Sequence, residues 1–308
     1  MSGLAGVIAG QTAICTVGQE GNSLNYRGYS VEDLAKYACF EEVAYLLLYG
    51  HLPTYSELSS YQDKLISMRE LPKELKIVLE KIPKTAHPMD VLRTGISFLG
   101  HLEPETDHYQ GLEIANRLIS VMPGILNYWY HFSHNNRRIE TNLNDLSLAS
   151  YFLHLLHNNK TPPDQLMAKT VDVSLTLYAE HEFNASTFAA RVCTATLSDF
   201  YSAIVAAIGT LRGPLHGGAN EAAMALIERF DSPEQAEQAI RKLLAEKVKI
   251  MGFGHRVYKI RDPRSDIIKA CSKELSGYLE DKVLYAVSEK IEQVMMTEEK
   301  NVSKLRFL

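Results

Sequence analysis

The amino-acid sequence predicts an all-α fold preceded by one short β-hairpin. Three observations carry this prediction: apolar residues recur at helical spacing along most of the chain, helix start and stop signals bracket these runs, and strand-like stretches occur only near the N-terminus. The length of 308 residues suffices for about two domains or one large one, and 46% hydrophobic with 22% charged residues is ordinary for a globular protein.

The N-terminal elements follow from turn and capping residues. The β-prone runs 12–17 and 23–29 flank a glycine-rich turn, which predicts the hairpin. Ser30 and Asp33 have the spacing of a helix N-cap and its partner, so we expect a helix to begin there. The helical pattern then continues and ends at Gly50.

Apolar runs of helical length occupy the middle of the chain. They cover residues 87–100, 114–132, 146–157 and 166–181. Residues 202–212 are apolar almost all round, which is typical of a helix buried inside a large protein.

Proline marks the helix starts in the last third of the chain. Ser232 is an N-cap, Pro233 occupies the first helical position and Gln235 completes a capping box. Apolar residues at helical spacing follow, and Asp262-Pro263 repeats the start signal. We find no internal repeat and no low-complexity linker.

Net charge and cysteine placement indicate a soluble, cytoplasmic protein. The formal net charge of −5 gives no general attraction to nucleic acid or to an anionic membrane. The first residues lack the basic and apolar regions of a signal peptide, and no apolar run is long enough to span a membrane. The four cysteines show no C-x-x-C spacing, which favours reduced thiols: Cys15, Cys39, Cys193 and Cys271.

The eleven histidines include two pairs at i, i+3 spacing, His131 with His134 and His154 with His157. Such pairs can bind a metal ion, but no third ligand is suggested nearby, and both pairs lie in aromatic, leucine-rich helices. We therefore interpret them as packing or surface histidines and predict no metal site.

Residues 247–264 form a strongly basic segment around His255. Six positive residues stand against one acid, Asp262, in a chain whose net charge is −5. This excess indicates an anionic ligand, although a solvated basic face is the simpler interpretation of a charge run alone. Two details favour the ligand. Glycines just before His255 allow close backbone approach, and Arg264 in the first turn of a helix opposes the helix dipole unless an anion binds there.

Two further histidines lie in segments that suit a binding site. His216 stands between Gly213-Pro214 and Gly217-Gly218, directly before a helix start. This bare backbone indicates close approach of a ligand, but a connecting turn explains it equally well. His181 ends an apolar helical run, where a histidine also packs at the negative end of the helix dipole. Together with Arg264 these histidines suit carbonyl chemistry, in which imidazoles polarise oxygen atoms and arginine holds a carboxylate.

Two long motifs, "GPLHGGANEAA" around His216 and "MGFGHRVYKIRDPR" around His255, resemble the citrate synthase family in sequence, order and separation. "YAEHEFNASTFAARV" around His181 matches a third motif of the family, and the resemblance runs through essentially the whole chain. Within the family, "HPMDVLRTGIS", "YWYHFSHNNRRI" and "LYAEHEFNAST" are most similar to the 2-methylcitrate synthases.

This resemblance implies a citrate-synthase-like multi-helical fold in a homodimer, with residues 1–216 in a large helical domain and residues 217–308 in a smaller one. It implies an acyltransferase that condenses an acyl-CoA, preferably propionyl-CoA, with oxaloacetate and water to give 2-methylcitrate and CoA. Acetyl-CoA as the acyl donor, as in a citrate synthase, is the alternative. The coenzyme A thioester is then a co-substrate, no cofactor is bound permanently, and neither nucleic acid nor a membrane is a partner.

The resemblance also implies roles for individual residues. His216 is expected to hydrogen-bond the thioester carbonyl and stabilise the enolate, and His255 to protonate or polarise the oxaloacetate ketone. His181 and Arg264 are expected to bind oxaloacetate. The family's coenzyme A contacts, made largely through backbone, match Lys249, Ile250, Met251, Gly252 and Phe253.

The C-terminal sequence departs from the family pattern. The family's catalytic base is an aspartate in a "PNxD"-like motif, whereas this chain reads "MMTEEKNVSKLRFL" and has no carboxylate side chain after Glu299. We therefore expect a C-terminally truncated member in which both domains lack their last part. Losing a general base removes about 10²–10⁴-fold of rate, so an inactive remnant is the second hypothesis. A nucleic-acid module that uses the basic segment is the third, and the net charge of −5 disfavours it.

Overall fold

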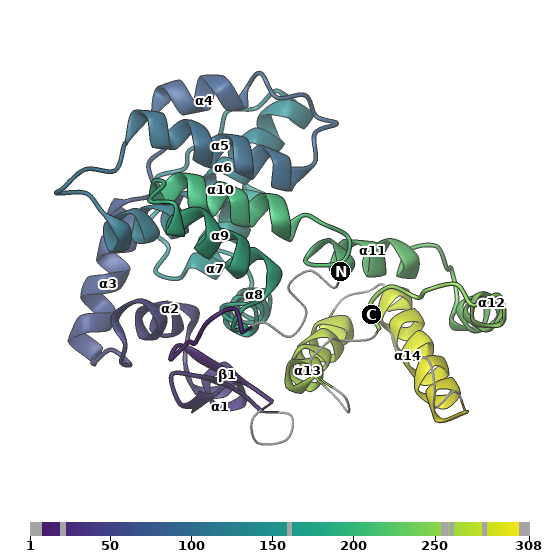
Figure 1. Cartoon of the computed structure of the whole chain (residues 1–308). Coiled ribbons are helices and arrows are strands. Elements are labelled where there is room, and N and C mark those ends of the chain that lie inside the picture. The colour runs from purple at the N-terminus through teal and green to yellow at the C-terminus, as the bar shows by residue number, and fades with distance from the viewer. Residues whose placement is uncertain are drawn as a thin grey trace. The chain divides into compact units, whose positions relative to one another are not determined.

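A computed structural model describes residues 8–18, 23–158, 162–253, 258, 262–278 and 282–301 of the chain. These residues form one small sheet and a series of helices, which confirms the predicted helical fold with its N-terminal β-hairpin (Figure 1). The chain divides into two compact units, residues 1–210 and 211–308. The first unit therefore ends earlier than the predicted domain boundary after His216, and the identification of the units as a large and a small domain stays a prediction.

The first unit contains the sheet and the first ten helices of the described residues. Its strands are β1 (Cys15–Val17), β2 (Leu24–Tyr26) and β3 (Tyr29–Ser30). Its helices are α1 (Val31–Tyr37), α2 (Phe40–Tyr49), α3 (Tyr55–Ser67), α4 (Lys73–Leu79), α5 (Pro88–Leu102), α6 (Gly111–Asn135), α7 (Leu148–His157), α8 (Gln165–Leu177), α9 (Ala185–Ala195) and α10 (Phe200–Leu211), the last of which reaches into the second unit.

The second unit contains α11 (Gly218–Ile227), α12 (Pro233–Ala245), α13 (Pro263–Tyr278) and α14 (Val283–Asn301). Within the described residues of both units, none of the helices combines the length and the apolar character that crossing a membrane requires.

The sheet is antiparallel, in the order β1-β2-β3. Val17 lies opposite Leu24, which confirms the predicted hairpin, although both strands are shorter than the β-prone runs. Residues 19–22 of its predicted turn lie outside the described residues. The third strand was not predicted. It forms because Arg27 and Gly28, with φ of 46° and 91°, reverse the chain directly after β2.

Capping residues set the first helices as predicted, with one interruption. The Ser30 hydroxyl accepts the Asp33 N–H at 3.0 Å, and α2 ends at Gly50 with φ of 96°, which a glycine adopts without strain. The predicted continuous helix is in fact two helices. Cys39 has extended backbone and caps α2, because the Glu42 carboxylate accepts its N–H at 2.7 Å.

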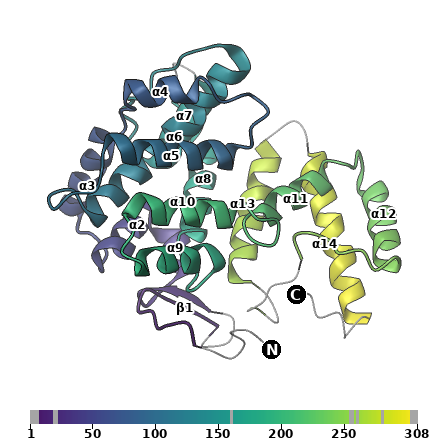
Figure 2. The same cartoon turned by 45° about the horizontal axis from the view of Figure 1, so that its top comes forward.

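The core of the first unit is built around α6, which packs against α3, α4, α5 and α7 (Figures 1 and 2). Apolar residues of α6 are fully buried along its length, among them Ile114, Val121 and Ile125. Helix α5 approaches α6 closely at Gly95, where an added Cβ would lie 2.7 Å from Ile125 Cγ2. This contact leaves no room for a larger residue.

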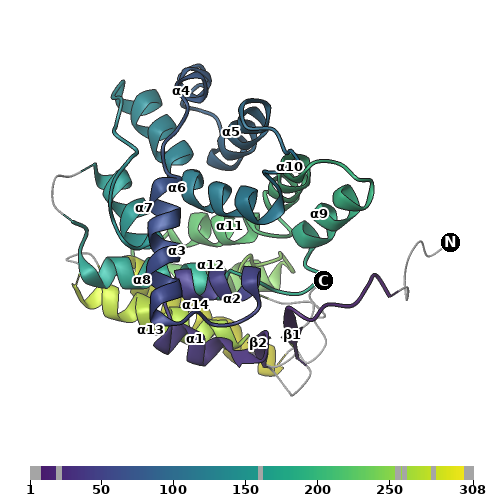
Figure 3. The same ribbon diagram turned by 90° about the vertical axis from the view of Figure 1, so that its left-hand side faces the viewer.

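Helix α8 connects the N-terminal elements to the rest of the first unit through its packing contacts. It packs against α1, α2 and α7, and α1 lies beside the sheet (Figure 3). Asp172 of α8 accepts the N–H of Phe40, the first residue of α2, at 3.0 Å. Burial raises the pKa of Asp172 to about 6. The middle of α8 is therefore fixed to the start of α2.

The burial expected for residues 202–212 is wrong in its extent. Tyr201, Ala203 and Ile208 are buried, but every other described side chain of α10 is at least partly exposed, and Leu211 is 37% exposed. An apolar pattern on all sides of a helix shows that the helix has no polar face. It does not show which sides other elements cover.

Helix α14 organises the second unit, since α11, α12 and α13 all pack against it. Ala236 and Ile240 of α12 are fully buried against Val287 and Ile291 of α14. The predicted start of α12 is confirmed, because Ser232 Oγ accepts the Gln235 N–H at 3.3 Å.

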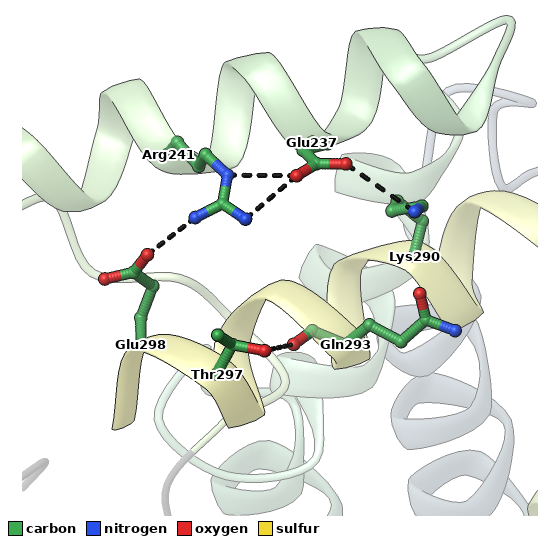
Figure 4. Close-up of polar contacts among 6 residues, drawn as sticks. All are labelled: Glu237, Arg241, Lys290, Gln293, Thr297 and Glu298. Atoms are coloured by element: carbon green, nitrogen blue, oxygen red, sulfur yellow. Dashed lines mark hydrogen bonds and ion pairs between the residues drawn. The ribbon is translucent and has the colours of Figure 1, made fainter. Parts of the chain in front are cut away.

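Ion pairs on one side join the same two helices (Figure 4). Arg241 of α12 donates to Glu237 at 2.8 Å and to Glu298 of α14 at 2.6 Å. Lys290 of α14 lies 3.5 Å from the second oxygen of Glu237. Each pair is partly exposed and contributes little, so the apolar face supplies most of the stability of this contact.

We expect Gly95→Ala to lower the free energy of unfolding by about 1–3 kcal/mol, because the new Cβ overpacks the contact with Ile125. Chemical denaturation monitored by circular dichroism measures this change. Gly111→Ala is the matched control, because its Cβ meets nothing within 4 Å. Equal stability of the two variants would show that α5 and α6 do not approach as described.

Candidate functional site

The loop that carries His216 is a compact series of turns that ends at the start of α11. The N–H groups of His216 and Gly218 both donate to the carbonyl of Gly213, at 2.9 and 3.1 Å. The His216 carbonyl then accepts the Ala219 N–H at 3.0 Å, within the first turn of α11. His216 therefore stands directly at the N-terminus of a helix, and its backbone helps to form that terminus.

The glycines of this loop are required by the fold itself. A Cβ at Gly217 would lie 2.7 Å from the Leu211 carbonyl oxygen, and one at Gly218 would lie 2.6 Å from that of Arg212. Real Cβ atoms do not approach backbone this closely. The bare backbone that the sequence shows around His216 is thus explained by chain reversal over the end of α10, and it is not by itself a sign of a ligand.

The side chain of His216 is partly buried, and this burial lowers its pKa from the ordinary value of 6.5. The positive end of the α11 dipole acts in the same direction. A neutral imidazole at this place is suited to donating a hydrogen bond to a carbonyl oxygen that becomes negative during a reaction.

Residues 249–253 form a tight turn after α12. Gly252 has φ of 95°, a conformation that other residues rarely adopt. Ile250 is 2% exposed and belongs with Phe253 to the apolar cluster formed by α12 and α14, whereas Lys249 is exposed. The side chains of Ile250 and Phe253 therefore serve the core, and this turn offers a ligand mainly its backbone.

The two predicted motifs of the second unit meet at this turn. A Cβ at Gly252 would lie 3.1 Å from Cβ of Ala223 on α11. The helix that begins just after His216 thus packs directly on the turn predicted to contact coenzyme A. Sequence spacing alone did not reveal this contact.

Arg264 lies in the first turn of α13, and its partner is Asp262. Asp262 Oδ1 accepts the Arg264 backbone N–H at 3.0 Å, which confirms the predicted cap. The same carboxylate pairs with the guanidinium through two bonds of 2.9 and 2.6 Å. The argument that only a bound anion offsets this charge is therefore wrong, because Asp262 provides the anion and also orients the guanidinium.

His255 lies outside the described residues, as do Arg256, Lys259 and Arg261 of the basic segment. The predictions made for His255 and for the charge of this segment therefore stay predictions.

His181 belongs to the first unit, in the turn between α8 and α9. The prediction that it ends a helix is wrong, because α8 ends at Leu177. The His181 carbonyl accepts the N–H of Asn184, which caps α9 by accepting the Thr187 N–H at 3.0 Å. The turn is partly exposed throughout.

Two acids beside His181 were missed by the sequence analysis. Burial raises the pKa of the Glu180 carboxylate, and the nearby backbone N–H groups of Glu182 and His181 partly offset this rise. Glu182 has φ of 51°, and its carboxylate accepts the Val17 N–H of β1 at 2.8 Å. The signal in the sequence is the pattern "EHE", which places a carboxylate on either side of the histidine.

The paired histidines have local partners. His131 is buried and bonds the Leu155 carbonyl of α7 at 2.9 Å, while His134 bonds Ser133 and the Tyr130 carbonyl on its own helix. His154 pairs with Asp145 at 3.1 Å. A search of the described residues finds no group of three or more histidine, cysteine or acidic side chains arranged to hold a metal ion.

We expect Gly218→Ala to destabilise the second unit by about 1–3 kcal/mol, because its Cβ would collide with backbone that cannot move aside. Thermal and chemical denaturation measure the loss. Gly277→Ala on α13 is the control, since its Cβ meets nothing within 4 Å. A Gly218→Ala variant as stable as this control would mean that the loop does not close as described.

The lowered pKa of His216 also predicts a pH dependence. The unfolded chain takes up a proton at higher pH than the folded chain does, so the stability that neutral His216 contributes is present above about pH 6.5 and is lost as the pH falls toward the lowered pKa. The free energy of unfolding should therefore fall more steeply from about pH 7 to 5 in the wild type than in His216→Gln. His157→Gln, at an exposed histidine, should match the wild type. Parallel profiles for wild type and His216→Gln would contradict the buried, neutral imidazole.

Comparison with known proteins assigns the chain to a family. A family model described as citrate synthase, C-terminal domain, matches residues 3–306. The 2-methylcitrate synthase of Shewanella oneidensis is 54% identical over 97% of this chain and 79% of its own length. The citrate synthase of Synechocystis sp. is 38% identical over 95% of this chain and 74% of its own length.

A solved structure agrees with these matches. The citrate synthase of Thermoplasma acidophilum, in a ternary complex with carboxymethyl coenzyme A and oxaloacetate, aligns with a TM-score of 0.89 and 32% identity. The alignment covers 98% of this chain and 80% of that one. With the helical fold and the His216 and His181 motifs in place, these similarities show that the chain belongs to the citrate synthase family of acyltransferases.

Proposed function

We propose that this chain condenses propionyl-CoA with oxaloacetate and water to give 2-methylcitrate and free coenzyme A. The observation that carries the choice within the family is the 54% identity with a 2-methylcitrate synthase over 97% of the chain. Acetyl-CoA is the alternative acyl donor. One methyl group in a pocket is worth only about 1–3 kcal/mol, so the preference is a matter of degree.

His216 is proposed to hydrogen-bond the thioester carbonyl as its α-carbon loses a proton and the oxygen gains negative charge. The lowered pKa of the partly buried ring supports this role. The imidazole is already neutral and does not have to be deprotonated when the substrate binds. Its place at the N-terminus of α11 adds the favourable end of a helix dipole. The loop that fixes it depends on Gly217 and Gly218.

His181 and Arg264 are proposed to bind oxaloacetate, and His255 to protonate or polarise its ketone. The pairing of Arg264 with Asp262 supports this, because it holds the planar guanidinium in one orientation before substrate arrives. The enolate carbon bonds to the ketone carbon as the carbonyl π bond breaks, and the resulting alkoxide takes a proton from His255. Water then cleaves the thioester and releases coenzyme A as the free thiol.

The turn formed by Lys249, Ile250, Met251, Gly252 and Phe253 is proposed to bind coenzyme A. Its two core side chains, Ile250 and Phe253, leave backbone groups for the ligand, and exposed Lys249 suits the phosphates. On this proposal coenzyme A is a co-substrate, no cofactor stays bound, and the protein acts as a cytoplasmic homodimer.

Oxaloacetate binding and turnover are measured independently, because binding does not require the base that removes the α-proton. An inactive protein that still binds oxaloacetate would match the second hypothesis of the sequence analysis.

Turnover is tested by release of free thiol from propionyl-CoA in the presence of oxaloacetate, with acetyl-CoA in a parallel series. We expect a higher kcat/KM with propionyl-CoA, and a drop in kcat of about 10²–10³-fold in His216→Ala, because an oxyanion donor is lost. His157→Ala should retain full activity. Turnover without dependence on His216 would overturn the assigned role.

Binding is tested by calorimetry with oxaloacetate. Arg264→Ala should abolish the heat of binding, and Arg264→Lys should weaken it, because lysine lacks the planar fork. Absence of binding to the wild type would reject the proposed substrate. Binding without any thiol release would restrict the proposal to a ligand-binding protein.

A further inference from the structure

The turn that carries His181 is tied to the N-terminal sheet by a carboxylate, and we infer that Glu182 is a positioning residue for His181. The contact joins the edge strand β1 to the turn between α8 and α9, across 165 positions of sequence. The inference rests on the proposed function, in which His181 binds oxaloacetate.

Glu182 adopts a backbone conformation that is costly for its residue type. Its φ of 51° lies in the left-handed region, where residues other than glycine, asparagine and aspartate are uncommon. Such a conformation persists only where surrounding contacts hold it. The Val17 N–H donates to Glu182 Oε1 at 2.8 Å, which is a contact of this kind at the turn.

The edge of the sheet gains from the same bond. Among the strands that the structure describes, β1 pairs with β2 alone, and the N–H of Val17 faces the other way, toward Glu182. An edge-strand N–H without a protein acceptor must otherwise rely on water. This hydrogen bond therefore gives an edge-strand N–H its acceptor and fixes the backbone beside His181.

The sheet also contacts the chain before the turn. Tyr26 of β2 is fully buried, and its hydroxyl donates to the carbonyls of Thr176 and Leu177, at 3.1 and 3.2 Å, at the end of α8. These bonds hold the end of α8, before the turn begins, whereas the bond of Glu182 lies within the turn, next to His181.

Packing provides only a partial anchor for this segment. No described side chain from Tyr178 to Phe200 is fully buried, although Phe183 lies against Gly10, where an added Cβ would be 3.0 Å from its ring, and Arg191 lies 4.7 Å over the same ring. Hydrogen bonds therefore contribute more than a buried core to the position of the turn. A carboxylate that only served solubility would not need a strained backbone and a partner at the strand edge.

The experiment compares three variants by two measurements. Glu182→Ala removes the tether, Glu182→Gln keeps an acceptor oxygen at the same reach, and Tyr26→Phe removes the other bond of the sheet to α8 and serves as the matched control. Histidine-ring NMR of protein with labelled histidine reports the surroundings of His181 directly, with exposed His157 as internal reference. Calorimetry gives Kd for oxaloacetate and, separately, for coenzyme A.

We expect Glu182→Ala to shift or broaden the His181 ring signals and to raise Kd for oxaloacetate about tenfold, with Kd for coenzyme A unchanged within about twofold. Glu182→Gln should restore both values to within about threefold of wild type. This rescue separates the tether from the charge, since losing a negative charge near an anionic substrate would by itself tighten binding. Tyr26→Phe should lower the denaturation midpoint while the His181 signals and Kd stay near wild type.

Unchanged His181 signals in Glu182→Ala would overturn the inference, and so would failure of Glu182→Gln to rescue. An effect of Tyr26→Phe as large as that of Glu182→Ala would also overturn it, because the sheet as a whole and not the carboxylate would then be responsible. If the wild type does not bind oxaloacetate, the proposed function fails, and the NMR comparison still decides whether Glu182 positions His181.

Discussion

The placement of His216 depends on one steric constraint, the close approach of Gly217 and Gly218 to the carbonyls at the end of α10. A Cβ at either position would come within 2.7 Å of a carbonyl oxygen. Only bare backbone lets the chain reverse there and start α11 at once. Helix α11 packs on the turn at Gly252. The same constraint therefore sets the position of the helix that follows the partly buried His216 imidazole and that contacts this backbone-rich turn.

Contacts within the protein already neutralise or partner the charged groups of each segment without a ligand. Asp262 neutralises and orients Arg264, Glu182 accepts the Val17 N–H beside His181, and burial keeps His216 toward its neutral form. These pairings follow from the cost of leaving ionised or polar groups without partners in a partly buried place. They leave side chains held in defined orientations, which reduces the entropy that substrate binding must overcome.

Much of the fold follows from local signals in the sequence. Ser30, Gly50, Ser232 and Asp262 act where their residue types predict, because caps and turns are decided by the nearest few backbone groups. The prediction that a helix ends at His181 is wrong. Helix α8 ends at Leu177, where the Tyr26 hydroxyl donates to the carbonyls of Thr176 and Leu177. The burial of α10 failed for a similar reason, because periodicity carries no information about which neighbours cover a face.

The sequence by itself determined the helical class, the caps, the family and the segments that carry His181, His216 and Arg264, since each is encoded in residues adjacent along the chain. Tertiary structure alone decided that the glycines beside His216 serve a chain reversal, that Ala223 meets Gly252, and that Val17 reaches Glu182. Those contacts join residues far apart in sequence, and their geometry depends on distances between elements that no local pattern records.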